Sequence, residues 1–235
     1  MQAETASRSE WLKARLALME KERELTLLKD EVTAQRQALP LVAVEKDYRF
    51  QTESGEKSLA ELFGTCEQLV VYHFMFGPDW DQGCPSCSFW ADNYNGTQKH
   101  LRARNTQLVA VSNAPLKKLL DYRRRLGWSF DWVSAEGSTF TGDFGASFHG
   151  GDTSDSQLGY NYSGSYHAEE SPGISTFIKL DDGRIAHNYS TFARGLEPAN
   201  GAYHLLDMTV LGRAESKLPF TMAWVKRNDE YEQSA

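Results

Sequence analysis

The chain has 235 residues, which suits one large domain, or one domain with an appendage, and allows a sizeable core. Hydrophobic residues make up 40% and charged residues 24%, as in an ordinary soluble globular protein, and the formal net charge of −7 disfavours nucleic acid or an anionic membrane as the main partner. Every apolar run is shorter than the ~20 residues of a transmembrane helix, and the first residues form no apolar signal-peptide core, so we expect a cytoplasmic protein.

Residues 1–40 are predicted to form an N-terminal helical arm. Residues 9–38 contain no glycine or proline, and Ser9 and Pro40 suit the start and the end of a helix. An apolar residue recurs at a heptad spacing, at Trp11, Leu18, Leu25, Val32 and Leu39. The companion positions are only half apolar, so two readings stay open: an arm docked on its own domain, or an arm exchanged between the chains of a homodimer.

Residues 41–225 are predicted to form one α/β domain. The expected elements are a hairpin from residue 42 with a turn at Gly55, a short helix over 58–64, a buried strand over 69–76, a helix over 87–104 that is weakened at 93–96, a strand over 107–112, a helix over 115–126 and a strand over 130–134. The alternation of strands and helices indicates parallel strands joined by right-handed crossovers.

The second half of the chain changes character. Residues 135–172 are rich in Gly, Ser, Asp and aromatic residues without clear periodicity, which predicts a long insertion that forms an ordered cover. A hairpin over 174–189 turns at 181–183, a helix is expected from Tyr203 to Leu211, and residues 226–235 are expected to be a flexible tail.

The segment Cys84-Pro85-Ser86-Cys87 carries the strongest chemical signal. It follows the buried strand and a polar turn, so the C-x-x-C pair lies at the expected start of a helix. There the outer thiol, Cys84, can be stabilised as a thiolate, while Cys87, one turn later, is expected to be buried and to act as the resolving thiol. Pro85 stiffens this turn, and the Ser86 hydroxyl can donate to sulfur.

Other roles for the cysteines are weaker. A zinc site needs two further ligands, and neither Cys66 nor the six scattered histidines form a second closely spaced pair, so we expect no metal. Cys66 is expected to be a free buried thiol. No G-x-G-x-x-G or Walker loop occurs, so no cofactor is expected.

Several neighbours of the dithiol are candidates for its surroundings. Asp92 can accept the proton of Cys87, and Trp80 and Trp90 can form walls of the site, although aromatic core packing explains the tryptophans equally well. His73, inside the predicted strand, is expected to be a hydrogen-bonded core histidine.

The order of elements resembles the thioredoxin fold, and residues 48–64 and 175–178 resemble its peroxiredoxin branch. Residues 72–80, 84–92 and 189–195 together resemble the DUF899 family of predicted dithiol-disulfide oxidoreductases, over nearly the whole chain. The resemblance implies a three-layer α/β/α domain with a central mixed sheet, to which the N-terminal helix is added. Ser175 takes the position of the proline that packs against the dithiol in thioredoxin, and His187 and Arg194 are expected to line an anionic or peroxide pocket, unless Arg194 simply pairs with a carboxylate.

These observations favour a thiol-disulfide oxidoreductase with Cys84 as nucleophile. Its partners would be a protein or small-molecule disulfide and a thiol reductant. One alternative is a thiol peroxidase, in which Cys87 traps a sulfenic acid on Cys84, although no peroxiredoxin-type T-x-x-C precedes Cys84. The other alternative is a non-catalytic binding module with a vestigial dithiol.

Overall fold

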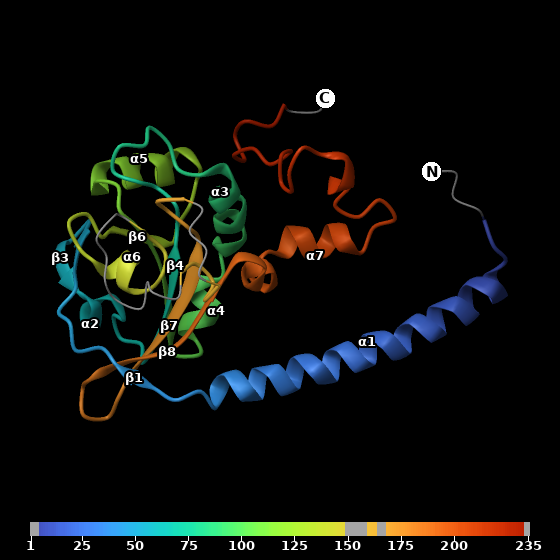
Figure 1. The fold of residues 1–235 in the computed structure, drawn as a ribbon, viewed down its shortest axis with the longest axis horizontal. Coiled ribbons are helices and arrows are strands. Elements are labelled where there is room, and N and C mark those ends of the chain that lie inside the picture. The colour runs from blue at the N-terminus through green and yellow to red at the C-terminus, as the bar shows by residue number, and fades with distance from the viewer. Residues whose placement is uncertain (1–4, 149–158, 164–167, 233–235) are drawn as a thin grey trace. The chain divides into compact units, whose positions relative to one another are not determined.

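The structure is a computed structural model that describes residues 5–148, 159–163 and 168–232 (Figure 1). The chain divides into two compact units, Met1–Pro40 and Leu41–Ala235. Each unit is described by itself.

The first unit consists of one long helix, α1 (Arg8–Gln37). Ser7, rather than the predicted Ser9, caps its start. The Ser7 hydroxyl accepts a bond from the Glu10 N–H at 3.3 Å, and the Glu10 carboxylate accepts the Ser7 N–H at 2.9 Å. This capping box requires a glutamate three residues after the cap, a spacing that Ser7 meets and Ser9 does not.

The second unit is built on a mixed sheet, which has eight strands within the described residues. The strands are β1 (Val42–Ala43), β2 (Arg49–Thr52), β3 (Gly55–Ser58), β4 (Gln68–His73), β5 (Thr106–Ser112), β6 (Asp131–Ser134), β7 (Gly173–Lys179) and β8 (Ile185–Phe192). Their order across the sheet is β1-β8-β7-β4-β5-β6-β2-β3. Strands β4, β5 and β6 are parallel, and the other pairings are antiparallel.

The centre of this sheet has the thioredoxin-like order. Strand β4 is parallel to β5 on one side and antiparallel to β7 on the other, and β8 continues the sheet beyond β7. The predicted three-layer α/β/α fold with a central mixed sheet and an added N-terminal helix is therefore confirmed.

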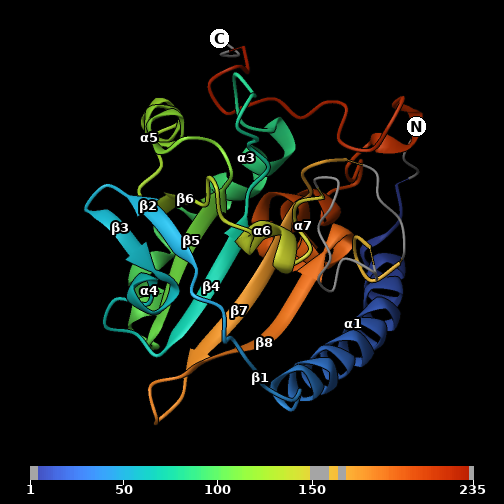
Figure 2. The same ribbon diagram turned by 60° about the vertical axis from the view of Figure 1, so that its left-hand side comes forward.

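Each face of the sheet has its own apolar core, because side chains of β4 alternate between the faces. Tyr72 belongs to the cluster that α3 (Pro85–Ala91), α4 (Gln98–Arg102), α5 (Leu116–Arg125) and α7 (Gly201–Asp207) cover. Val71 belongs to the opposite cluster, under α2 (Leu59–Leu62) and α6 (Phe140–Asp143). Figure 2 shows the sheet between these two layers.

Three predicted elements differ in their bounds. The first hairpin joins β2 and β3 around Gly55, whose φ of +101° suits a glycine, whereas β1 pairs with β8. The helix expected over 87–104 is divided into α3, a 3₁₀ turn (Asp92–Tyr94) and α4, with Gly96 at a φ of +82° in the break. Helix α7 ends at Asp207, earlier than the predicted Leu211.

The predicted insertion over 135–172 lies partly outside the described residues. Its described parts include α6 and an isolated bridge between Ser147 and Glu170. The Tyr160 hydroxyl donates to the carbonyl of Pro172 at 2.8 Å and accepts the Ala193 N–H at 2.8 Å. These bonds tie the insertion to the segment before β7 and to the end of β8.

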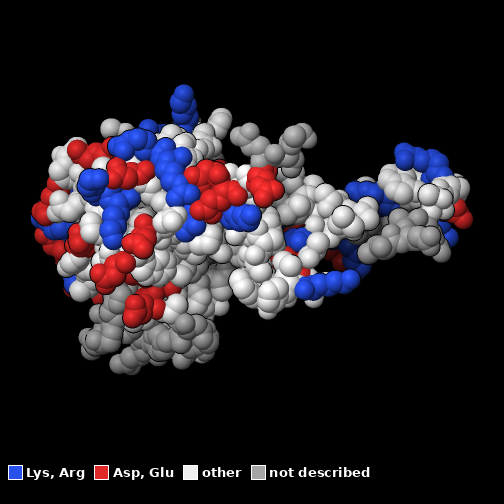
Figure 3. Space-filling view, turned by 90° about the horizontal axis from the view of Figure 1, so that it is seen from above, with Lys and Arg blue, Asp and Glu red and all other residues white. Residues whose placement is uncertain are grey.

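Charged side chains of both signs are interspersed on the face drawn in Figure 3. None of the helices in the described part of the chain is long and apolar enough to cross a membrane.

Candidate active site

The dithiol lies at the junction between the loop after β4 and helix α3. The Cys84 N–H donates to the carbonyl of Met75 at 3.1 Å, which holds the end of this loop against its beginning. Cys84 is the N-cap residue of α3, and Pro85 occupies the first helical position, where its missing N–H costs nothing. Cys87 follows one turn into the helix, so its side chain lies beneath that of Cys84.

The two thiols are free and differ in environment: Cys84 is partly exposed, whereas Cys87 is buried. A hydrogen bond from the Cys87 thiol is the main cause that lowers the pKa of Cys84 to about 6, against the opposing effect of burial. The N–H groups of Cys87 and Ser86 and the Ser86 hydroxyl also lower it. Burial, followed by the bond to Cys84 and its charge, raises the pKa of Cys87 well above its usual value.

A cavity of about 540 Å³ reaches the dithiol from the side of Cys87. Four residues that the sequence predicted, Ser86, Cys87, Trp90 and Arg194, line it. Its other walls come from β4 and the loop after it, the segment before β7, the 3₁₀ helix Ala193–Ala199, α7 and residues 213–222; they are Tyr72, Met75, Pro172, Ala193, Leu196, Glu197, Tyr203, Arg213, Glu215, Thr221 and Met222.

Ser175 lies away from this cavity. It points from β7 toward the opposite face of the sheet, where it is fully buried and its hydroxyl bonds to His73 Nε2 at 2.9 Å. Pro172, the residue before β7, instead lines the cavity with Cys87. Ser175 is the third residue of β7, which begins at Gly173, so the residue directly before this strand is Pro172 rather than Ser175.

Arg194 lines the cavity and also pairs with a carboxylate, and its role in binding an anion or a peroxide stays a prediction. Its guanidinium bonds to Glu197 at 2.7 Å, and Arg213 bonds to the same carboxylate at 3.2 Å. These two arginines, Arg194 first, lower the pKa of Glu197 to about 2. The Arg194 side chain remains 87% exposed, whereas Arg213 is largely buried and lies 3.8 Å from the Tyr203 ring centroid.

Trp80 and Asp92 do not line the cavity. Trp80 packs against Gly77, where an added Cβ would lie 2.9 Å from the indole nitrogen. Asp92 accepts bonds from Trp128 at 2.7 Å and Asn228 at 2.6 Å, and burial raises its pKa. Both bonds fall on Oδ1, so the role of Asp92 as acceptor of the Cys87 proton stays a prediction.

His187 belongs to a polar chain on the opposite face of the sheet. Its Nε2 bonds to Ser190 Oγ at 2.8 Å, Ser190 bonds to Ser175 at 2.8 Å, and Ser175 bonds to His73. His73 is 2% exposed, and burial lowers its pKa to about 3. His73 is therefore a buried, hydrogen-bonded and neutral histidine, as the sequence indicated.

Two tyrosines contact the dithiol segment without having been predicted. Tyr72, buried in β4, donates its hydroxyl to the carbonyl of Cys87 at 3.3 Å, and this hydroxyl also acts to lower the pKa of the Cys87 thiol, against the larger effect of burial. Tyr122, on α5, lies 3.2 Å from the Gly83 carbonyl and 3.0 Å from Ser88 Oγ. In the sequence, Tyr72 lies in a predicted strand and Tyr122 in a predicted helix, and aromatic residues at such places indicate core packing. The pattern does not indicate a bond to the dithiol.

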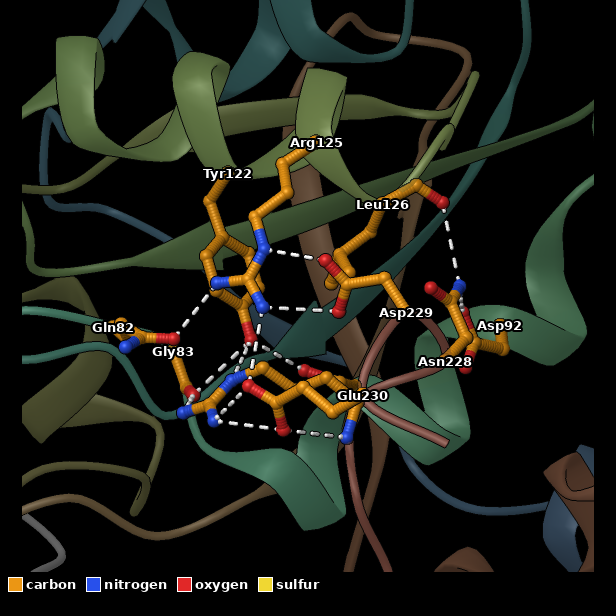
Figure 4. A network of polar contacts seen from close by, with 11 residues as sticks. Gln82, Gly83, Asp92, Tyr122, Arg125, Leu126, Asn228, Asp229 and Glu230 are labelled. Atoms are coloured by element: carbon orange, nitrogen blue, oxygen red, sulfur yellow. Dashed lines mark hydrogen bonds and ion pairs between the residues drawn. The ribbon is translucent and has the colours of Figure 1, made fainter. Parts of the chain in front are cut away.

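The C-terminal segment also reaches the dithiol loop. Arg227 donates to the Gly83 carbonyl at 2.8 Å and to the Tyr122 hydroxyl at 2.6 Å. Arg125 on α5 binds both carboxylate oxygens of Asp229, at 2.6 and 2.9 Å, and bonds to Gln82 at 2.8 Å. Figure 4 shows this network between the dithiol loop, α5 and the tail. The sequence predicted a flexible tail from residue 226 onward. The polar composition of this tail did not indicate that its side chains bond to the dithiol loop and to α5.

Metal ligands do not cluster in the described ranges, where no group of three or more His, Cys, Asp or Glu side chains could hold a metal ion. Cys66, the remaining thiol, is 6% exposed and belongs to neither the dithiol nor its cavity.

The model of the family DUF899, described as "Bacterial protein of unknown function", matches residues 1–231. The chain belongs to this family. A comparison with curated proteins gave no match.

Solved structures similar to this DUF899 protein include three peroxiredoxin-type proteins. Peroxidoxin BcpB from Mycobacterium tuberculosis is 13% identical, with a TM-score of 0.46 over 68% of this chain and 92% of its own. Peroxiredoxin Q of Xanthomonas campestris is 15% identical, with a TM-score of 0.45 over 70% and 93% of the two chains. The yeast mitochondrial 1-Cys peroxiredoxin is 13% identical, with a TM-score of 0.39 over 72% and 78%. At such values the site has to be interpreted from this chain's own residues.

Proposed function

We propose that this protein is a dithiol-disulfide oxidoreductase in which Cys84 is the nucleophile and Cys87 the resolving thiol. One observation carries the proposal: Cys84, the N-cap of α3, is partly exposed and has a pKa lowered to about 6 mainly by a hydrogen bond from Cys87, which is buried one turn further into the helix. A thiolate stabilised in this way is present at neutral pH, and its resolving partner remains a protonated thiol until it is needed.

The reaction takes place in two exchanges. The Cys84 thiolate attacks one sulfur of a substrate disulfide, forming a mixed disulfide with Cys84 and releasing the other sulfur as a thiolate. The Cys87 thiol then loses its proton, which the first released thiolate accepts, and attacks the Cys84 sulfur. The second half of the substrate leaves as a thiolate and takes a proton from water, so two electrons have passed from the dithiol to the substrate, and Cys84 and Cys87 are joined in a disulfide.

Burial of Cys87 supports this order of events. Its raised pKa makes it a poor first nucleophile at neutral pH, and the Tyr72 hydroxyl, which bonds to the Cys87 carbonyl, also favours the charge that develops on Cys87 during resolution. The mixed disulfide would place the substrate next to the cavity that Ser86, Cys87 and Pro172 line. We propose that this cavity holds the part of the substrate nearest the sulfur.

An external thiol, in a cytoplasmic setting, would supply the electrons that reduce the Cys84–Cys87 disulfide back to the dithiol. The sequence has no dinucleotide or nucleotide loop to supply them. A second protein dithiol or a small thiol can reduce the Cys84–Cys87 disulfide by the same exchange in reverse.

Turnover of a small aromatic disulfide and of hydrogen peroxide, each with a thiol reductant, tests the proposal. The wild type should reduce the disulfide, Cys84→Ser should abolish turnover, and Cys87→Ser should trap the mixed disulfide, detectable by mass. Cys66→Ser is the matched control and should retain wild-type turnover, because Cys66 lies outside the site. Wild-type turnover of both substrates no faster than the protein-free background would leave a binding module, and turnover that survives Cys84→Ser would overturn the role of Cys84. Cys84-dependent turnover of peroxide alone would replace disulfide exchange by peroxidase chemistry.

A further inference from the structure

Arg227, in the C-terminal segment, is bound to the residues that hold Cys84 in place. Its Nη2 donates to the carbonyl of Gly83, the residue directly before Cys84, at 2.8 Å. Its Nε donates to the Tyr122 hydroxyl at 2.6 Å. The Arg227 side chain is only 16% exposed, so these bonds form where water competes little.

Tyr122 and Ser88 bond to the peptides next to Cys84. Ser88 Oγ donates to the Cys84 carbonyl at 2.9 Å, which uses the single proton of this hydroxyl. The Tyr122 hydroxyl accepts from Arg227, lies 3.0 Å from Ser88 Oγ and donates to the Gly83 carbonyl at 3.2 Å. Arg227 and Tyr122 thus converge on the peptide before Cys84, while Ser88 holds the carbonyl of Cys84 itself.

We infer that Arg227 is a positioning residue for the nucleophile, and that the C-terminal segment sets the reactivity of Cys84. The guanidinium fixes the peptide before Cys84, so that the Cys84 sulfur stays within reach of the Ser86 and Cys87 N–H groups. The charge of the guanidinium also favours the thiolate over the thiol. This inference rests on the proposed function, in which Cys84 attacks as a thiolate.

The surrounding charges hold Arg227 in this position. Its Nη1 donates to Glu230 Oε1 at 3.0 Å, and Arg125 donates to the same oxygen at 3.1 Å. Tyrosines also face the dithiol, and burial raises the pKa of each; they are Tyr72, Tyr94, Tyr122 and Tyr160. Arg227 is therefore the cation that bonds directly to the backbone carbonyl preceding Cys84.

Thiolate absorbance near 240 nm, followed against pH for the reduced full-length protein, tests this inference. Arg227→Met should move the titration of Cys84 upward by about one pH unit. At pH 6 the thiolate fraction would then fall from about one-half to about one-tenth, and the rate of alkylation would fall with it. Asn228→Ala is the matched control, because Asn228 bonds to Asp92 and Leu126 but not to the dithiol loop, and its titration should remain that of the wild type.

Tyr122→Phe serves as the second variant, since it removes the hydroxyl that bonds to Arg227 and to the Gly83 carbonyl but keeps the ring in the core. It should move the titration of Cys84 upward by less than Arg227→Met does. This variant also tests the inference if Arg227→Met does not fold. Wild-type titration in folded Arg227→Met, or in Tyr122→Phe if Arg227→Met does not fold, would overturn the inference. A wild-type protein with no Cys84-dependent titration near pH 6 would instead overturn the proposed function.

Discussion

Gly83 lies directly against the ring of Phe74. A Cβ added at Gly83 would stand 2.7 Å from Phe74 Cε1 and 3.1 Å from a ring carbon of Tyr122. The residue before the nucleophile is therefore a glycine because two aromatic rings of the core leave no room for a side chain. The same close packing positions the Gly83 carbonyl for Arg227.

We expect Gly83→Ala to lower the free energy of unfolding by about 1–3 kcal/mol, the usual cost of overpacking. The displaced loop should also slow alkylation of Cys84, since the sulfur moves relative to its donors. Denaturant unfolding and alkylation rates measure the two effects. Phe74→Leu added to Gly83→Ala should restore part of both, because it removes the clashing ring atoms; a double variant that is simply additive would contradict the packing argument.

Tyr72→Phe should slow the resolving step. It removes the hydroxyl that bonds to the Cys87 carbonyl at 3.3 Å and that lowers the pKa of the Cys87 thiol. The mixed disulfide on Cys84 should then live longer, which quenching and mass spectrometry detect, and stability should fall by about 1 kcal/mol.

Tyr94→Phe is the control for this variant. Tyr94 packs edge-on against Tyr72 at 5.1 Å between ring centroids, and its buried hydroxyl has no hydrogen-bond partner within the described residues. Its removal should leave resolution unchanged and should not destabilise the fold. Equal effects of the two variants would assign the slower step to packing rather than to the Tyr72 hydroxyl.

The reactivity of Cys84 should rise with pH and level off above about 7. The thiolate is the reactive form, and the bond from Cys87 lowers the pKa of Cys84 to about 6. Stopped-flow alkylation from pH 4.5 to 9 should give a single titration that is lost in Cys84→Ser. A midpoint near 8.5, the value of an unperturbed thiol, would contradict the hydrogen bonds to its sulfur.

The same pKa shifts predict how the stability of the reduced protein depends on pH. Between about pH 6 and 8.5 the unfolded chain keeps the Cys84 proton and the folded chain does not, so this group adds stability as pH rises. Above about pH 8.5 the unfolded chain loses the Cys87 proton while the folded chain retains it, so stability falls again. Unfolding of wild type against Cys84→Ser and Cys87→Ser, measured at several pH values, separates the two contributions.

His73 should make the fold sensitive to acid. Burial lowers the pKa of His73 to about 3. Below about pH 6.5 this imidazole is protonated in the unfolded chain but stays neutral in the folded chain, so the free energy of unfolding falls toward pH 3. The loss from this group approaches about 1.4 kcal/mol per pH unit. His73→Gln should flatten the slope between pH 6 and 4, whereas the exposed His204→Gln should not.

Arg194 should affect substrate binding more than chemistry. Its side chain is 87% exposed at the cavity wall, so its pair with Glu197 is weak and an anionic substrate can compete for the guanidinium. Arg194→Met should raise KM for a carboxylate-bearing disulfide several-fold with little change in kcat, and should spare a neutral one. Arg184→Met, which removes an exposed arginine paired with Asp182, should change neither value.

Features that depend on neighbouring residues could be predicted from the amino-acid sequence. The apolar run that became β4, Pro85 in the first turn of α3 and the C-x-x-C spacing together predicted a dithiol at the start of a helix. Helix starts and buried strands are encoded locally, by capping, by proline and by apolar residues in a row. The order of these elements then indicated the fold, because crossover connections follow few rules.

Only the tertiary structure decided which distant residues surround the dithiol. The register of β7 against β4 turned Ser175 to the opposite face and brought Pro172 to the cavity. Arg227 reaches Gly83 across 144 positions of the chain, from a polar segment with no periodic pattern. Such contacts depend on how distant segments of the chain pack together in space. The pattern of neighbouring residues in the sequence carries no information about this packing.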